Sequence, residues 1–102
     1  MARKDPNIIP YTEQDDLLEE FCDIVSKLKT KGAIFDFFKD LLNRQERLML
    51  HRRISIAKML MDDLTYNEIQ EKLKVSPTTI ARVDRVLNFG RGGYINAVKN
   101  YK

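Results

Sequence analysis

The sequence has very few of the residues that build disulfides and common metal sites. Its 102 residues include one Cys, one His and no Trp. A single Cys cannot form an internal disulfide, so nothing argues for secretion. One Cys and one His are also too few for a zinc site of the usual kind.

Long apolar runs are absent as well. No run approaches the roughly 18 residues that a membrane span needs, and the start, Met1-Ala2-Arg3-Lys4-Asp5-Pro6, lacks the apolar stretch of a signal peptide. The hydrophobic fraction of 43% is nevertheless too high for a disordered tail. We therefore expect one small cytoplasmic domain with a single core, which a partner could complete, and no association with membranes.

Catalytic patterns are missing too. The sequence shows no nucleophile paired with a base and no carboxylate pair, and the glycines at positions 90–93 match neither the GxGxxG nor the P-loop spacing. We expect neither enzyme activity nor a cofactor.

The charge is divided unevenly along the chain. Residues 1–43 hold six Lys and Arg against nine acids, or −3, whereas residues 44–102 hold twelve against six, or +6. A basic C-terminal part suits a surface that faces phosphates. Solvated helix surfaces in any domain would give the same pattern, so charge alone leaves both interpretations open.

Apolar spacing predicts helices from residue 12 onward and no strand, hence an all-α fold. Residues 1–11 are expected to be a mobile arm. A first helix is expected to start at a Thr12 cap and to end at Gly32, with Cys22 as a small core residue beside its apolar stripe. A short apolar segment, 33–42, follows, and residues 94–101 are expected to form a last helix.

Three further helix starts carry capping signals. Asn43 with Glu46 and Thr65 with Glu68 have capping-box spacing, and Ser76-Pro77 joins a Ser cap to Pro at the first helical position. The helix after Asn43 is expected to run to about residue 61. Its apolar residues cover more than one face, which indicates burial among neighbouring helices or at a subunit interface.

The segment 65–87 has the pattern of a helix-turn-helix. A helix over 66–73, a turn Lys74-Val75-Ser76 and a helix over 77–87 would place the second helix in the DNA major groove. Ile80 would face inward with Val83 or Val86. An ordinary capped helical hairpin is the alternative interpretation. The residues expected to contact DNA are Asn67, Gln70, Ser76, Pro77, Thr78, Thr79, Arg82 and Arg85.

Two positions depart from the commonest helix-turn-helix pattern. Gln70 stands where a small residue is usual, and Lys74 stands where a left-handed Gly would relieve the turn. A side chain at a left-handed position costs roughly 1 kcal/mol, which a packed core can absorb.

The run Leu42-Asn43-Arg44-Gln45-Glu46-Arg47, followed by Arg52-Arg53-Ile54 and by Thr79-Ile80-Ala81-Arg82 in the second hairpin helix, resembles the Trp repressor family. The similarity is greatest to the shorter Trp-repressor-like group often labelled YerC/YecD. It implies an intertwined homodimer of about six helices per subunit. The first helix and the long middle helix, both within 12–62, and the last helix of both chains would build one shared core.

The resemblance also implies a ligand pocket. In the family, two arginines hold the indole of tryptophan between them, and they match Arg53 and Arg82 here. The family's glycine after the second arginine is Val83, and a family threonine is Asn43. Tryptophan is therefore not expected as a co-ligand. Phosphate contacts, or salt bridges to residues such as Glu68, are the ordinary alternative for the two arginines.

Taken together, these patterns predict a homodimeric, sequence-specific regulator that binds double-stranded DNA, most simply a repressor. A repressor that responds to a metabolite bound near Arg53 and Arg82 is one alternative. A helix-turn-helix module for protein interaction, such as a piece of a sigma factor or replication initiator, is another.

Overall fold

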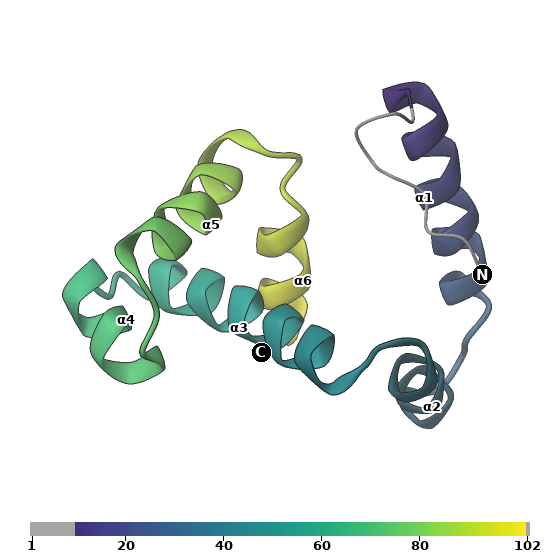
Figure 1. Cartoon of the computed structure of the whole chain (residues 1–102), viewed down its shortest axis with the longest axis horizontal. Coiled ribbons are helices and arrows are strands. Elements are labelled where there is room, and N and C mark those ends of the chain that lie inside the picture. Colours follow the sequence, from purple (N-terminus) through teal and green to yellow (C-terminus); the bar gives the residue numbers. More distant parts are fainter. Residues whose placement is uncertain (1–9, 102) are drawn as a thin grey trace. The chain divides into compact units, whose positions relative to one another are not determined.

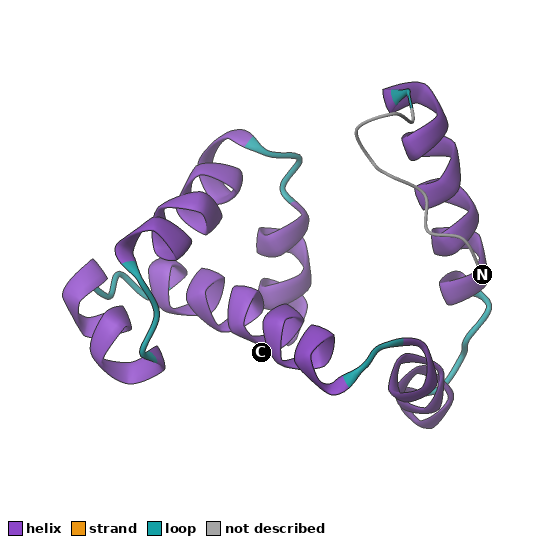
Figure 2. Cartoon of the chain, viewed as in Figure 1, coloured by secondary structure: helices purple, strands orange, loops and turns teal. Residues whose placement is uncertain are grey.

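The computed structural model describes residues 10–101, and the arm expected at residues 1–11 lies almost wholly outside this range. Within it the chain forms six helices and no strand, as Figures 1 and 2 show. The all-α prediction is confirmed, and none of these helices is both long and apolar enough to cross a bilayer. The helices are α1 (Tyr11–Ser26), α2 (Lys31–Leu41), α3 (Arg44–Met61), α4 (Tyr66–Leu73), α5 (Pro77–Phe89) and α6 (Gly93–Tyr101).

The chain divides into two compact units, residues 1–41 and residues 42–102. The described part of the first unit consists of α1 and α2, and neither helix contains a buried residue. Aromatic contacts join the two helices, because the ring of Phe21 lies 6.2 Å from that of Phe37 and 6.1 Å from that of Phe38.

The second unit has a core of its own. Ile56 and Ala57 of α3, Ile69 of α4, and Ile80 and Val83 of α5 form one buried cluster. Helices α4, α5 and α6 all pack against α3, and Figure 1 shows α3 as the central element of this unit. The helix-turn-helix segment, α4 and α5, is therefore packed against α3 through a buried apolar core, which is its packed support.

Both predicted ends of the first helix were wrong. Helix α1 begins at Tyr11 after Pro10, whose carbonyl accepts the first hydrogen bond, from Gln14 N at 3.0 Å. Thr12 lies inside the first turn and does not cap it. The extended backbone of Pro10 serves as the helix boundary.

Gly32 lies in the first turn of α2 and does not end α1. Helix α1 ends at Ser26, whose hydroxyl donates to the carbonyl of Asp23 at 2.8 Å. The next helix, α2, is capped by Thr30, whose hydroxyl accepts a hydrogen bond from Ala33 N at 3.1 Å. A Thr cap thus opens α2 two residues before the glycine.

Cys22 is exposed, against the expectation of a small core residue. The apolar residues of α1 that are half-buried are Phe21 and Val25, four residues apart on one side of the helix. Cys22 lies about 100° around the helix from Phe21, so it misses that side.

Candidate nucleic-acid interface

The helix-turn-helix begins with the predicted capping box of α4. Glu68 N donates to Thr65 Oγ1 at 3.2 Å, and Thr65 N donates to Glu68 Oε1 at 2.9 Å. The backbone N–H of Thr65, which donates to this carboxylate, holds the pKa of Glu68 below its usual range, together with the Thr65 side chain and the charge of Lys72. The box at the start of α3 is also present, with both hydrogen bonds between Asn43 and Glu46 at 2.9 Å. Both predictions are confirmed.

The turn between α4 and α5 has the backbone that the sequence predicts. Lys74 has φ 55° and ψ 46°, in the left-handed region, and its N–H donates to Gln70 O at 2.8 Å. Val75 packs against the buried cluster. Ser76 then caps α5, because its Oγ accepts from Thr79 N at 3.3 Å. The turn thus fixes where α5 starts.

Helix α5 has one buried side and one exposed side. Ile80 and Val83 lie in the core, whereas Val86 is exposed, which decides between the two residues proposed for the inner face. Thr78, Arg82 and Arg85 are exposed. The inner side is held by apolar packing, so the outer side is free to meet a ligand along its length.

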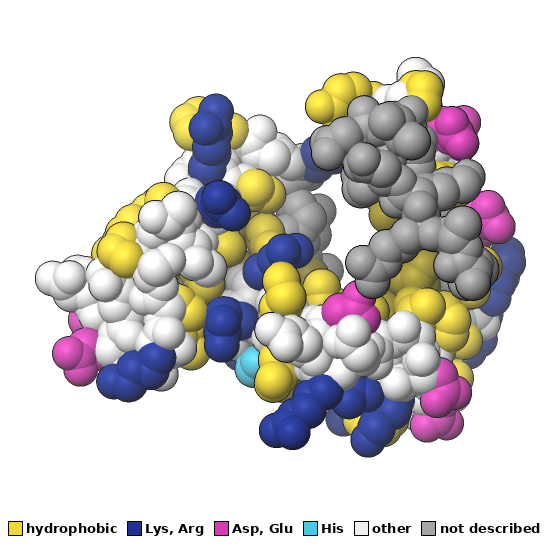
Figure 3. All heavy atoms as spheres, in the orientation of Figure 1, with side chains coloured by type: hydrophobic (Ala, Val, Ile, Leu, Met, Phe, Trp, Pro, Cys, Tyr) yellow, Lys and Arg dark blue, Asp and Glu magenta, His cyan; other side chains and the backbone are white. Residues whose placement is uncertain are grey.

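The two threonines at the start of α5 differ. Thr78 is exposed, whereas Thr79 is half-buried and its hydroxyl lies 3.0 Å from that of Ser76. Thr78 is therefore the threonine better placed to reach a base edge. Basic side chains also gather over α5 and the adjoining part of α3 on the face shown in Figure 3.

A cavity of about 230 Å³ lies between α3 and α5. Of the four residues expected in a ligand pocket, the structure brings together Arg53, Arg82 and Val83, and Val83 is only 5% exposed. Asn43 caps α3 and does not line this cavity. The full lining is Met49, Arg52, Arg53, Thr79, Arg82 and Val83.

The arginines of this cavity have no carboxylate partner within residues 10–101. Among the described residues, Arg52, Arg53 and Arg82 form no ion pair, so the expected alternative of a salt bridge to Glu68 does not occur. Three unpaired guanidinium groups around one hollow create a positive potential that suits a phosphate or another anion.

The other expected contacts lie on α4 and where α5 begins. Asn67 and Gln70 line a separate hollow with Glu71 and Lys74, so the structure does not join them to the arginine cavity. Ser76 and Pro77 are exposed at the turn between the two sites.

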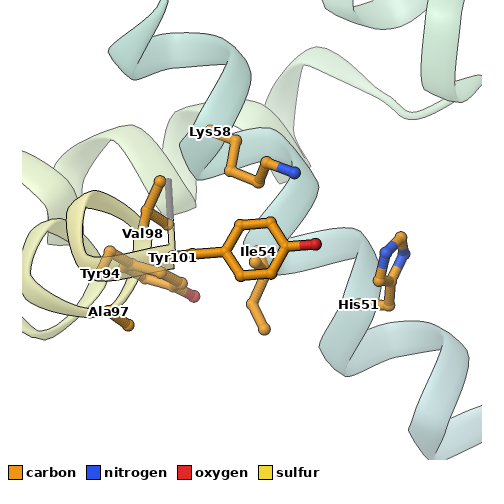
Figure 4. A pocket seen from close by; sticks show the side chains of 7 residues that line it. All are labelled: His51, Ile54, Lys58, Tyr94, Ala97, Val98 and Tyr101. Atoms are coloured by element: carbon orange, nitrogen blue, oxygen red, sulfur yellow. The ribbon is translucent and has the colours of Figure 1, made fainter.

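A second, apolar cavity of about 350 Å³ lies between α3 and α6. Figure 4 shows Tyr94, Val98 and Tyr101 of α6 beside Ile54 and Lys58 of α3. Lys58 Nζ lies 5.4 Å from the centre of the Tyr101 ring. Ile54 is 45% exposed although it is apolar, so the described residues of the second unit leave this groove open.

Sequence reasoning missed two parts of the interface. Arg52 was noticed only as a part of the family pattern, although it sits beside Arg53 in the cavity. The hydrogen bond from Tyr66 to Asp84 gave no signal at all, because the two residues lie 18 positions apart. Only the crossing of α4 and α5 brings them together.

Comparison with known proteins agrees with this geometry. Residues 16–102 match the family model described as Trp repressor protein. The chain is 33% identical to the protein YerC of Bacillus subtilis (strain 168) over 85 residues, which are 83% of this chain and 82% of YerC.

Solved structures show the same fold. The TrpR-like protein of Eubacterium eligens ATCC 27750 is 36% identical, with a TM-score of 0.76, over 84% of this chain and 89% of that protein. A chain from Staphylococcus aureus is 30% identical, with a TM-score of 0.76, over 84% and 86%. The family is one of helix-turn-helix regulators rather than enzymes. The chain is thus a YerC-type member of the Trp repressor family.

Proposed function

We propose that this protein is a sequence-specific, DNA-binding transcriptional regulator that acts as a homodimer and places α5 in the major groove. The observation that carries the proposal is the capped hairpin on its packed support, with Ile80 and Val83 inside and Thr78, Arg82 and Arg85 outside. The family is named for repressors, and we extend that action to this chain.

The side chains of α5 divide the work of recognition. Thr78, at the exposed start of the helix, offers a hydroxyl and a methyl group to base edges. Arg82 and Arg85 lie farther along and offer charge to phosphates, which fixes position without reading sequence.

Two substitutions in the protein test this division. Binding affinity is measured for a preferred site, selected from random duplexes, and for random DNA. Thr78→Ala should weaken the preferred site by about 1–3 kcal/mol and leave random DNA nearly unchanged. Arg85→Ala should weaken binding to the preferred site and to random DNA by the same factor. It should also reduce the slope of log affinity against log salt concentration by about 1. Lys99→Ala removes an exposed charge from α6, serves as the charge control and should change little. Equal losses from Thr78→Ala on both DNAs would reject base reading.

The homodimer is proposed because a single chain leaves many apolar side chains exposed. The first unit buries none of its helical residues, and Leu18 of α1 is 59% exposed. On α3, Leu48, Met49 and Leu50 are also exposed, next to the apolar cavity at Ile54. Exposed apolar side chains in such number favour an interface, and a second copy supplies the same surfaces in return.

Sedimentation at micromolar concentration tests the dimer. We expect twice the chain mass of 12.0 kDa. A folded, helical particle of single-chain mass would overturn the proposal.

A second candidate function is control by a small anionic metabolite. The specific observation is the cavity at Arg52, Arg53 and Arg82, which no carboxylate in the described residues neutralises. The cavity lies beside Thr79, at the start of α5, so an occupant could alter how α5 meets DNA. Screening anionic metabolites for a change in DNA affinity that Arg53→Ala abolishes would support this function.

A further inference from the structure

Asp84 is the only acidic residue of α5, and both of its carboxylate oxygens are engaged. The hydroxyl of Tyr66, the first residue of α4, donates to Oδ2 at 2.7 Å. The amide of Asn88, one turn farther along α5, donates to Oδ1 at 2.9 Å and to the carbonyl oxygen of Asp84 at 2.9 Å. A single carboxylate therefore joins the two helices of the hairpin.

The bond between Tyr66 and Asp84 is of a different kind from the rest of the hairpin packing. Ile69 and Ile80 meet as apolar side chains, and such burial is non-directional. A hydroxyl that donates to a carboxylate at 2.7 Å is short, directional and charge-assisted. In the described residues no other side-chain hydrogen bond links α4 to α5, so this bond constrains how α5 is rotated on α4.

The rotation of α5 decides where its outer residues point. Thr78 lies near the start of the helix, and Asp84 lies almost two turns later on the flank toward α4. Asp84 and Tyr66 are both half-buried. Their bond thus anchors the inner flank of α5 and leaves the outer side to DNA.

We propose that Tyr66, Asp84 and Asn88 act as a positioning clamp, which sets the orientation of α5 and so the sequence specificity of DNA binding without touching DNA. The clamp rests on the proposed function. The raised pKa of Tyr66, caused by its hydrogen bond to Asp84, by partial burial and by the charge of Asp84, agrees with an engaged hydroxyl.

Tyr66→Phe in the full-length protein tests the clamp, because it removes one hydroxyl and keeps the ring. Dissociation constants are measured for a preferred site selected from random duplexes and for random DNA. We expect the ratio of the two affinities to fall about tenfold, as loss of a charge-assisted hydrogen bond would give. Random DNA affinity and its salt slope should stay the same, since the phosphate contacts remain.

Three variants sharpen the result. Tyr94→Phe is the matched control, because it removes a hydroxyl that has no partner in the described residues, and it should leave the ratio unchanged. Asp84→Asn keeps an acceptor oxygen for Tyr66, so it should lose less specificity than Asp84→Ala. The double variant Tyr66→Phe/Asp84→Ala should lose no more specificity than Asp84→Ala alone, because both changes break the same bond.

Each outcome has one meaning. Equal losses on both DNAs, or lowered stability with an unchanged ratio, would show that Tyr66 only stabilises the fold and would overturn the clamp. A wild-type protein that prefers no sequence would overturn the proposed function, and the clamp with it. In that case a titration of tyrosine absorbance against pH, in the wild type and in Tyr66→Phe, still tests the hydrogen bond. The wild type should show one phenol of raised pKa that Tyr66→Phe lacks.

Discussion

The two units of the chain differ in how they hold themselves together. The second unit buries Ile56, Ile69 and Ile80 completely, whereas no helical residue of the first unit is buried. Their charges differ as well, because the sequence is acidic up to residue 43 and basic beyond it. The buried core and the helix-turn-helix thus lie in the second unit, whereas the helices of the first unit leave apolar side chains such as Leu18 exposed.

The largest effect should follow from removing core volume in the second unit. Ile80→Ala deletes a fully buried side chain beneath the outer face of α5. We expect it to lower the free energy of unfolding by about 2–5 kcal/mol, as similar core truncations do. Urea unfolding followed by circular dichroism measures this, and a loss below about 1 kcal/mol would show that the core is elsewhere.

A charge on the apolar face of the first unit should separate assembly from folding. Leu18→Asp puts a carboxylate on a surface that the dimer would cover, at a cost of several kcal/mol if it stays ionised and unpaired. We expect mainly single chains by sedimentation at micromolar concentration, with the helicity of the second unit kept. Glu19→Gln, on the polar side of α1, is the control and should remain dimeric. A dimeric Leu18→Asp variant would remove the first unit from the interface.

A smaller effect is expected at the turn of the hairpin. Lys74 has a left-handed backbone with φ 55°, which is strained for a residue with a side chain. Lys74→Gly removes this strain and should raise the free energy of unfolding by up to about 1 kcal/mol. Lys72→Gly, inside α4, is the matched control and should lower it by about 0.5–1 kcal/mol. Chemical denaturation compares the two variants. A change of the same sign in both would contradict the account of the turn.

The smallest effect, none, is expected from tryptophan. The resemblance to the family implies a glycine at the position of Val83, whose nearly buried side chain lines the arginine cavity. Crowding of that kind typically costs 1–3 kcal/mol. Calorimetry should therefore show no tryptophan binding below millimolar concentration, and DNA affinity should not respond to it. Binding at tens of micromolar that Arg82→Ala abolishes would show that Val83 leaves the site open.

The comparison also separates what sequence could predict from what it could not. In the second unit the caps at Asn43, Thr65 and Ser76 were predicted because their donors and acceptors lie three residues apart. The strained position of Lys74 followed from the turn pattern. In the first unit Thr12 was predicted to start α1 and Gly32 to end it, whereas the helix starts after Pro10 and ends at Ser26. Several residues there could start or end a helix, and little packing decides among them.

The candidate site was predictable only where it is local or follows a family pattern. Thr78, Arg82 and Arg85 share one helix, so periodicity alone placed them on its outer side. The bond from Tyr66 to Asp84 depends on the angle between α4 and α5, which no spacing encodes. Long-range geometry of this kind has to come from the structure.

The central claim, a dimer that reads DNA through α5, is tested most directly by selecting bound fragments from random duplex DNA with the purified protein. A two-fold symmetric dimer predicts an enriched palindrome, with half-sites centred about one helical turn, or roughly 10 base pairs, apart. Selection that yields no common motif, or a single half-site without its inverted repeat, would contradict the account.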